Sequence, residues 1–556
     1  MVSRKQLDLI LPAALCAAAM FAVTTPGRTA SGPDSGTPPA ARKFYPDDPL
    51  LREPAPRPVL KVETRQVDDI YDFLWNMYVT PAHEGKEAKR NPTPAGDTNT
   101  LGDVPDSAWY TNRHYYHRMS IEELQRGPGN STPPDANGTW RITSAKSDGL
   151  TPGFVIEDAN KNRYVVKFDP PRYPELCSAP DVIGSKVFYA LGYNTPENYI
   201  IHFRRENLEI GEGVTYRDPS GKKRPLTSSV LDELLKAQPR ASDGTYRALA
   251  SRWISGKVVG PFSYEGTRTD DPNDIVAHQN RRELRGLRVF AAWLNHQDTR
   301  SINSMDTLVT ENGVPYLKHY LLDFGSILGS AGVGPKLAWY GHEYVIERKA
   351  AAEQMVTFGF NPPRWARSEY RQYTGTGMLD YQSFDPVTWK PTFPNPAFLL
   401  CDRGDAFWAA KQVAAFSDDD IRALVKTGEY SDPRATDWIA ECLIKRRDKI
   451  VAAAFAMVLP LDKFRVSDGE LTFEDLAASS AGGMARQYEV RWSKSDEFGH
   501  LTALPNAVGA SIPAAGGAAY LAATIGCVSA ENACPKPITV YLRRAAKSFQ
   551  VVGIDR

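Results

Sequence analysis

The chain has 556 residues, with 66 Lys+Arg against 66 Asp+Glu and a formal net charge of zero. At roughly 100–200 residues per domain, this length allows about three or four domains. The balanced charge excludes a protein that coats nucleic acid through a basic field, and we expect no nucleic-acid partner. An aromatic content of 10% excludes wholesale disorder, and six cysteines exclude a disulfide-dense scaffold.

The first 30 residues read as a targeting segment. Residues 9–23 are almost wholly apolar, which suits the hydrophobic region of a signal peptide and is short for a membrane span. A cleavage site at Ala30 is poor, and Cys16 lies in only a weak lipoprotein motif. We therefore expect an exported protein, either periplasmic, secreted or held by an uncleaved N-terminal membrane anchor. The alternative is a buried or frayed helix of a cytosolic protein.

Residues 31–65 are rich in Pro and Gly and are predicted to form an exposed linker. Residues 66–79 follow with apolar side chains at the spacing of an amphipathic helix. We expect this helix to pack onto a domain rather than to take part in chemistry. The apolar positions are Val67, Ile70, Phe73, Leu74 and Met77.

Residues 139–168 have the pattern of strands, with a turn at 158–162. A helix is predicted over 181–192, a short buried strand over 198–203 and helical structure over 227–252. The very polar segment 260–285 is either a solvated loop or part of the lining of a cleft.

The second half begins with a predicted helix over 280–295 and a strand over 316–325. Three helical stretches are expected within 405–458. Short strands separated by Gly, Pro and Asn then predict a small β domain over 465–556, with a sandwich as its expected form and binding of a partner or surface as its expected role.

Cysteines near the end of the chain allow a disulfide if the protein is exported. Cys527 and Cys534 are the best candidate pair. Two free buried thiols are an almost equal alternative.

Two linked segments carry the strongest chemical signal. Residues 293–308 contain His296-x-Asp298-x-Arg300-x-x-Asn303, and a DFG tripeptide begins at Asp323. Phosphoryl transfer needs such a set, because one carboxylate orients the attacking hydroxyl while an amide and a second carboxylate hold Mg²⁺ against nucleotide phosphates. The cation at Arg300 is placed to steady the transferring group.

A lysine upstream completes the set. Lys167 ends a predicted strand, where its side chain can reach nucleotide phosphates. Such a lysine usually needs an acidic partner, for which Asp181 and Glu175 are the candidates. Residues 144–153 could fold over the phosphates, although they lack a GxGxxG motif. The glycine-rich stretch 329–336 resembles a P-loop only superficially, because a proline precedes its final lysine.

This order of motifs resembles the protein-kinase-like superfamily, in its atypical bacterial branch of HipA-type persistence kinases and spore-coat kinases. The resemblance, which covers about residues 140–455, implies an α+β, two-lobed protein-kinase-like fold. The strand pattern near the end of the chain adds to it the C-terminal all-β, sandwich-like accessory domain. The N-terminal helix and the small lobe would occupy 66–260, the large lobe 261–460 and the β domain 465–556.

The same resemblance implies the roles of individual residues and a requirement for ATP and Mg²⁺. Lys167 would bind the nucleotide phosphates with Asp181 as its partner, and Asp298 would be the catalytic base. Asn303 and Asp323 would hold Mg²⁺, and His296 would brace the loop. The expected activity is transfer of a phosphoryl group from Mg·ATP to a protein or small-molecule hydroxyl.

Departures from the kinase pattern keep other interpretations open. Asn303 and Asp323 are twenty residues apart, a wide spacing that a hairpin turn at 311–313 would use. The alternatives are a catalytically inactive binding or scaffold protein at the cell surface or periplasm, and nucleotidyl transfer on the same fold. The acidic and amide residues could instead be turn or cap residues, Lys167 a solvated strand lysine, and Asp181 a helix N-cap.

Overall fold

The computed structural model describes residues 41–82, 92–129, 132–145, 152–218, 220–367, 370–478, 486–514, 516–528, 535–546 and 548–556. Residues 43–556 form one compact unit. The predicted targeting segment 1–30 and most of segment 144–153 lie outside the described residues. Within the described ranges, no helix is both long enough and apolar enough to cross a membrane.

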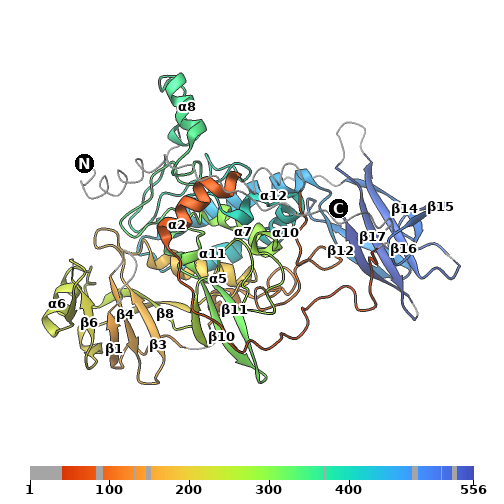
Figure 1. The fold of residues 1–556 in the computed structure, drawn as a ribbon. Coiled ribbons are helices and arrows are strands. Elements are labelled where there is room, and N and C mark those ends of the chain that lie inside the picture. Colours follow the sequence, from red (N-terminus) through yellow and green to blue (C-terminus); the bar gives the residue numbers. More distant parts are fainter. Residues whose placement is uncertain are drawn as a thin grey trace, which may run out of the picture. The chain divides into compact units, whose positions relative to one another are not determined.

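A six-stranded sheet with the order β4-β8-β3-β2-β1-β5 forms the first folded layer (Figure 1). All its neighbours are antiparallel except β1 and β5. The alternating apolar residues of its strands build one hydrophobic core with the apolar face of a short helix, α6. The predicted strands over 139–168 and 198–203 are confirmed. The strands are β1 (Trp140–Ala145), β2 (Gly153–Glu157), β3 (Arg163–Lys167), β4 (Asn198–Phe203), β5 (Leu208–Ile210) and β8 (Tyr246–Arg252).

The helical prediction for 227–252 is wrong in its second half. Helix α6 covers only Ser228–Lys236, and the chain then returns as β8 between β3 and β4. Tyr246, Ala248 and Ala250 are buried at alternate positions, which is the pattern of a strand. Alanine favours a helix in isolation, but the unpaired edges of β3 and β4 offer backbone partners that override this weak preference. A small hairpin, β6 (Thr215–Arg217) and β7 (Lys223–Pro225), precedes α6.

Helices build a second and larger core. Tryptophans 293 and 408 are almost fully buried at its centre. The predicted helices over 181–192, 280–295 and 405–458 are confirmed within a few residues. Segments before the sheet also belong to this core, since Trp109, Tyr110 and Leu124 are buried in it. The helices are α4 (Ile121–Arg126), α5 (Ser178–Ala190), α7 (Arg282–Leu294), α9 (Pro396–Leu399), α10 (Arg403–Ala414), α11 (Asp418–Lys426) and α12 (Pro433–Met457).

Two strands of a three-stranded sheet lie between the two predicted metal ligands in the sequence. The sheet has the order β11-β10-β9, with β9 (Lys257–Gly260), β10 (Ser304–Glu311) and β11 (Val314–Leu321). Asn312 and Gly313 connect β10 to β11 with φ of 51° and 78°, as a tight hairpin turn requires. The extra residues between Asn303 and Asp323 therefore form this hairpin, as predicted.

The polar segment 260–285 is not a solvated loop. Arg268, Asp274, His278 and Arg281 are all at least 94% buried, since none exposes more than 6% of its surface. His278 Nε2 lies 2.7 Å from Asp274 Oδ2, and an Arg268 nitrogen lies 3.3 Å from an oxygen of Asp306 on β10. Hence these charges satisfy one another inside the fold, which is how buried ionic groups are tolerated.

The predicted helix over 66–79 is present, but the prediction of which side chains it buries is wrong. It consists of α2 (Asp69–Leu74) followed by a π-helical turn, η2 (Trp75–Val79). Met77 is buried, whereas Ile70 is 70% and Leu74 41% exposed. The π-helical turn inserts an extra residue and rotates the later side chains relative to the earlier ones, so a regular helical spacing does not apply across it.

The carboxyl end folds into strands, as predicted. The described residues form one five-stranded antiparallel sheet, ordered β15-β14-β16-β17-β18, and a hairpin of β12 and β13 that shares its core. This arrangement does not confirm a sandwich. Cys527 is disulfide-bonded, while its predicted partner, Cys534, lies outside the described residues. The strands are β12 (Leu461–Ser467), β13 (Glu470–Asp475), β14 (Gln487–Ser495), β15 (Leu501–Val508), β16 (Tyr520–Val528), β17 (Ile538–Arg544) and β18 (Phe549–Asp555).

A glycine in α5 sets how closely the DFG turn packs on this helix. A Cβ atom at Gly184 would lie 2.5 Å from Phe324 Cβ and 2.9 Å from Ile327 Cδ1. We expect Gly184→Ala to lower the free energy of unfolding by about 1–3 kcal/mol, because overpacking outweighs the better helix propensity of alanine. Thermal and denaturant unfolding measure this. Gly526→Ala is the control, since its Cβ would meet nothing closer than 3.9 Å; equal stabilities of the two variants would contradict the expected close packing.

Candidate active site

Lys167 joins the sheet to the DFG turn. It is the last residue of β3, and its Nζ lies 3.3 Å from Asp181 Oδ2 and 3.0 Å from Asp323 Oδ1. Burial by itself would lower the pKa of Lys167, but the two carboxylates outweigh it and raise the pKa well above its usual value. Lys167 is thus a charged, ion-paired lysine and not a solvated strand residue.

Asp181 is buried and serves as a junction between three elements. Its Oδ2 faces Lys167, while its Oδ1 accepts hydrogen bonds from Asn198 Nδ2 at 2.9 Å and from the Phe324 backbone N–H at 3.1 Å. Burial raises the pKa of Asp181 despite the adjacent lysine. The carboxylate therefore fixes β3, β4 and the DFG turn relative to one another, and the Asp side chain is long enough to do so.

The position where α5 begins decides whether Asp181 is the partner of the lysine or the N-cap of the helix. The helix begins at Ser178 with Cys177 as its N-cap residue, so Asp181 lies inside the helix and is not its cap. Glu175, the rival partner for the lysine, accepts a hydrogen bond from the Ser431 backbone N–H at 3.1 Å instead. Of the two acids, Asp181 is the one paired with the lysine.

The predicted catalytic loop leaves α7 through Asn295, which ends the helix in the left-handed conformation with φ of 52°. In this loop the Arg300 Nε donates to Asp298 Oδ1. Burial would raise the pKa of Asp298, but the Arg300 guanidinium, together with Lys336 and the Asn303 amide, outweighs burial and lowers it. Asp298 is consequently ionised at neutral pH, and its side chain remains 25% exposed.

An acidic residue that the sequence did not single out completes this cluster. Asp69, the first residue of α2, accepts two hydrogen bonds from Arg300, at 2.8 and 3.1 Å. The helix expected only to pack therefore reaches the catalytic loop. A pocket of about 350 Å³ opens beside it, lined among others by Tyr71, Trp75 and Ser301. Three acids within five residues, starting at Asp68, were a signal that could have drawn attention to this helix.

Asn303 and Asp323 are brought together by backbone contacts. The Leu322 N–H donates to the Asn303 carbonyl at 2.9 Å, so the residue before Asp323 adjoins Asn303 directly. Asn303 donates through Nδ2 to the Asp298 carbonyl at 2.7 Å, which turns its Oδ1 away from that bond. Asp323 has φ of 56° and starts the turn η6 (Phe324–Ser326).

These two side chains fit a magnesium ion held jointly with a nucleotide. Mg²⁺ prefers oxygen ligands and is usually bound by one or two carboxylates together with substrate phosphates and water. Asp323 supplies a carboxylate and Asn303 an amide oxygen. In the described part of the chain, no group of three or more His, Cys, Asp or Glu could hold a metal ion. A metal at this site would complete its coordination with phosphate oxygens and water.

His296 is a structural residue of the loop. It is 4% exposed, and its ring meets the rings of Phe188 and Phe324 edge to face at 5.8 and 6.0 Å. Burial lowers the pKa of His296 to about 4. The imidazole is accordingly neutral at pH 7, and its ring contacts the DFG turn at Phe324.

Stability should fall in mild acid because three histidines are held neutral in the folded state. Burial lowers the pKa of His114, His296 and His342 from 6.5 to about 4. The unfolded chain then binds more protons between pH 6.5 and 4, so the stabilisation is complete above this window and lost as pH falls through it. At pH 5 each histidine should cost about 2 kcal/mol relative to pH 7.5.

Urea unfolding at both pH values measures this loss of stability. In His296→Phe the difference between pH 7.5 and pH 5 should shrink by about 2 kcal/mol, since one titrating group has been removed. Identical pH dependences for the variant and the wild-type protein would contradict a buried neutral His296.

Lys336 is a second residue that sequence reasoning missed. It is 9% exposed, and its Nζ donates to the Ser326 carbonyl at 2.9 Å, directly after the DFG tripeptide. Burial lowers the pKa of Lys336 to about 8, with the charges of Asp298 and Arg300 acting on it in opposite directions. The sequence signal that could have found Lys336 was the glycine-rich stretch 329–336, which resembles a P-loop only superficially.

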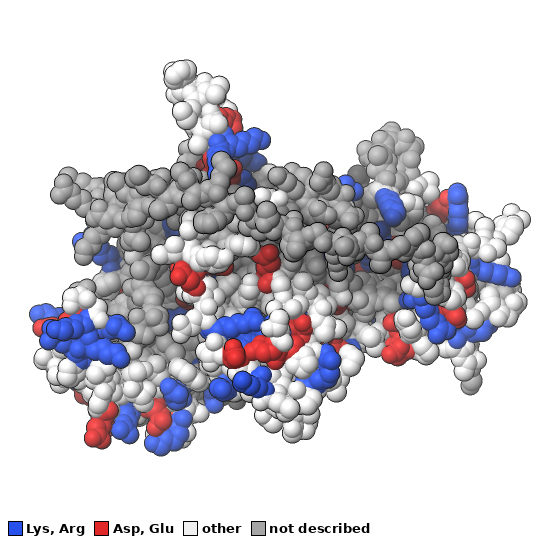
Figure 2. Space-filling model, viewed as in Figure 1, with Lys and Arg blue, Asp and Glu red and all other residues white. Residues whose placement is uncertain are grey.

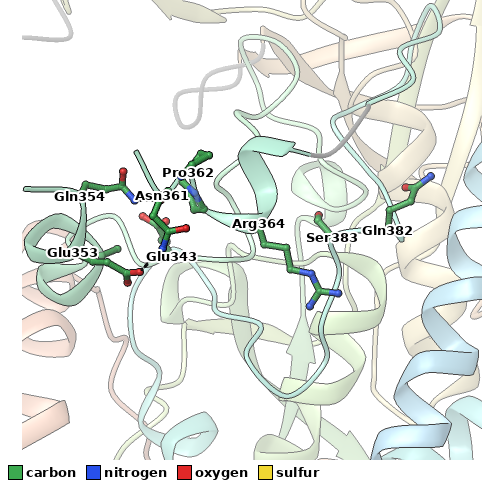
Figure 3. A pocket seen from close by; sticks show the side chains of 10 residues that line it. Glu343, Glu353, Gln354, Asn361, Pro362, Arg364, Gln382 and Ser383 are labelled. Atoms are coloured by element: carbon green, nitrogen blue, oxygen red, sulfur yellow. Dashed lines mark hydrogen bonds between the residues drawn. The ribbon is translucent and has the colours of Figure 1, made fainter. Parts of the chain in front are cut away.

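A pocket of about 750 Å³ lies apart from this set (Figure 3). It is bounded by α8 (Arg348–Val356) and the segment that follows. None of the predicted site residues lines it. Its polar lining includes Glu343, Glu353, Gln354, Asn361, Arg364, Gln382 and Ser383.

Comparisons with known proteins identify no family. No family model and no curated protein matches the chain. Among solved structures, the Helicobacter pylori proinflammatory kinase CtkA resembles it with 10% identity and a TM-score of 0.30, over 59% of this chain and 98% of that chain. The Golgi casein kinase gives 10% identity and a TM-score of 0.26, over 74% and 96% of the two chains.

A structure of the Golgi casein kinase with Mn/ADP bound gives 11% identity and a TM-score of 0.26, over 74% and 98% of the two chains. Similarities at these TM-scores carry no argument about activity, and the resemblance to the persistence-kinase and spore-coat branch stays a prediction. We base the function proposed below on the contacts between residues.

Proposed function

We propose that this protein is a phosphotransferase that uses Mg·ATP to phosphorylate a hydroxyl group of a protein or small molecule. One observation carries the proposal: Lys167 from the sheet forms ion pairs with both Asp181 and Asp323. Leu322, the residue before Asp323, donates its backbone N–H to the Asn303 carbonyl, and the Asn303 side chain donates to the Asp298 carbonyl. Residues from four separate segments therefore meet where a nucleotide's phosphates and a metal would need them.

Each side chain has a task in this reaction. Lys167 neutralises nucleotide phosphates while Asp181 holds it in place, and Asn303 and Asp323 present oxygens to Mg²⁺. Bound Mg²⁺ would draw negative charge from the phosphates during transfer. The ionised Asp298 orients the acceptor hydroxyl and takes its proton. As the new P–O bond forms at that oxygen, the bond from the γ-phosphorus to the bridging oxygen breaks, and its electron pair leaves with ADP.

The acceptor and the location of the protein are parts of the same proposal. We infer that the chain acts outside the cytosol, with its N-terminal segment as signal or anchor. The disulfide at Cys527 supports this, because disulfides persist mainly in oxidising compartments. The pocket beside Ser301 is a candidate site for the acceptor. The C-terminal β domain is proposed to bind a partner or surface.

Nucleic acid is not proposed as a partner. On the face drawn in Figure 2, Lys and Arg side chains are interspersed with Asp and Glu among the described residues. Nucleic-acid binding requires a continuous basic surface along the phosphate backbone. The charge pattern of this face supports an acceptor of another class.

Parallel incubation with γ-labelled and α-labelled ATP tests the proposed reaction. Phosphotransfer predicts Mg²⁺-dependent labelling of an acceptor or of the protein itself from the γ-label only. Labelling from the α-label would instead establish nucleotidyl transfer. If the protein neither transfers label nor binds Mg·ATP in calorimetry, the enzyme proposal fails and the non-catalytic scaffold alternative takes its place.

A further inference from the structure

A buried cation beside the predicted catalytic loop has no carboxylate partner among the residues that the structure describes. Lys336 is buried like Lys411, but Lys411 pairs with two carboxylates, as the half-buried Lys167 also does. Within the described ranges Lys336 forms no such ion pair. Its nitrogen donates to the carbonyl of Ser326 and lies 5.5 Å from the centre of the Tyr340 ring. A buried ammonium without an anion is costly, so its retention calls for an explanation.

The segment that carries Lys336 is built to place it. The Leu328 N–H donates to the Leu294 carbonyl at 2.8 Å, which ties the segment to the end of α7 where the catalytic loop begins. The Lys336 N–H then closes a loop by donating to the Gly329 carbonyl at 2.9 Å. Gly329 has φ of 77°, and a Cβ there would lie 2.1 Å from the Met378 carbonyl oxygen. Only glycine permits this close approach of the two backbones.

The surroundings of Lys336 belong to the proposed transfer site. Ser326, whose carbonyl accepts the hydrogen bond from the Lys336 ammonium, ends the turn that starts at Asp323. The positive charge of Lys336 helps to lower the pKa of Asp298, the proposed base. An anion between the metal ligands and the base would therefore lie within the influence of this ammonium. In phosphoryl transfer, the group in that position is the γ-phosphoryl group.

We propose that Lys336 is a catalytic residue whose ammonium binds the terminal phosphate of the nucleotide and stays on its oxygens during transfer. This inference rests on the proposed function and adds to it a second phosphate-binding lysine, supplied by the segment after the DFG turn. Lys167 would hold phosphates on the sheet side, and Lys336 would neutralise charge on the side of the acceptor. Charge-assisted hydrogen bonds of this kind strengthen as negative charge develops on the transferring group.

Discrimination between two nucleotides tests the role of Lys336. We would measure by calorimetry the affinities of Mg·ADP and of a non-hydrolysable Mg·ATP analogue for the wild-type protein, Lys336→Met and Lys336→Arg. We expect Lys336→Met to lose about tenfold in affinity for the triphosphate analogue, the loss of one charge-assisted contact. The affinity for Mg·ADP should stay within about twofold. Lys336→Arg should recover part of the loss, and Lys349→Met, at an exposed lysine of α8, should lose none.

The possible outcomes separate the inference from the function on which it rests. Equal affinities of wild-type protein and Lys336→Met for the triphosphate analogue would overturn the role of Lys336. So would an equal loss for both nucleotides, because that is the result expected of a purely structural lysine. If the wild-type protein binds neither nucleotide, the proposed function itself fails.

Discussion

Asp298→Asn is expected to lower the rate of phosphotransfer by about 10²–10⁴-fold, the usual contribution of a positioned general base. The amide keeps the shape of the carboxyl group but cannot take the proton of the acceptor hydroxyl. Arg300 retains its two hydrogen bonds to Asp69, so we expect the loop to keep its structure. The measurement is the initial rate of transfer from γ-labelled ATP at saturating Mg²⁺.

Nucleotide binding distinguishes a chemical defect from a structural one in Asp298→Asn. Its affinity for Mg·ATP should remain within about threefold of the wild-type value, because the base faces the acceptor and not the nucleotide phosphates. Asp419→Asn, at an exposed acid in the first turn of α11, is the matched control and should keep full activity. A variant at Asp298 that transfers phosphate at the wild-type rate would exclude this residue as the base.

Lys167→Met should have the second large effect, on nucleotide affinity and on stability together. Removing the ammonium leaves the buried Asp181 without its cation, which typically costs about 3–5 kcal/mol for one partner of a buried pair. It also removes the proposed contact with the phosphates. We expect Mg·ATP binding to fall below detection in calorimetry and the unfolding midpoint in urea to decrease.

A double variant separates these two consequences. In Lys167→Met with Asp181→Asn, no buried charge is left without its partner, and the new amide oxygen at position 181 can still accept the hydrogen bonds from Asn198 and the Phe324 N–H. We expect the double variant to unfold close to the wild-type midpoint and still not to bind Mg·ATP. Lys161→Met, at an exposed lysine paired with Glu157, should change neither property. Nucleotide binding by the double variant at wild-type affinity would show that Lys167 does not contact the phosphates.

Much of the candidate site was predictable because its signals are local. The spacing from His296 to Asn303, the DFG tripeptide and the strand ending at Lys167 each lie within a few residues. Their local secondary structure also follows from hydrophobic period and turn residues. Hence the helix before the loop, the strand before the turn and the β10–β11 hairpin were all expected, and all are present.

Other features could not be predicted, because they depend on partners far away in the sequence. The residues of β8 favour a helix in isolation and became a strand because β3 and β4 offered hydrogen bonds. The choice of Asp181 over Glu175 depended on where α5 begins and on the position of Asn198. Propensities within one segment contain no information about either.

The chemical groups of this protein and their order can be read directly from its residues: a strand lysine, a loop with an acid and an amide, and an acid at a sharp turn. Which of these groups meet depends on how the chain folds. Folding paired Lys167 with Asp181 and Asp323, brought Asp69 to Arg300, and buried Lys336 with no carboxylate partner among the described residues. The reason is that ion pairs and burial act across space, between segments whose separation along the chain ranges from 14 to 231 residues.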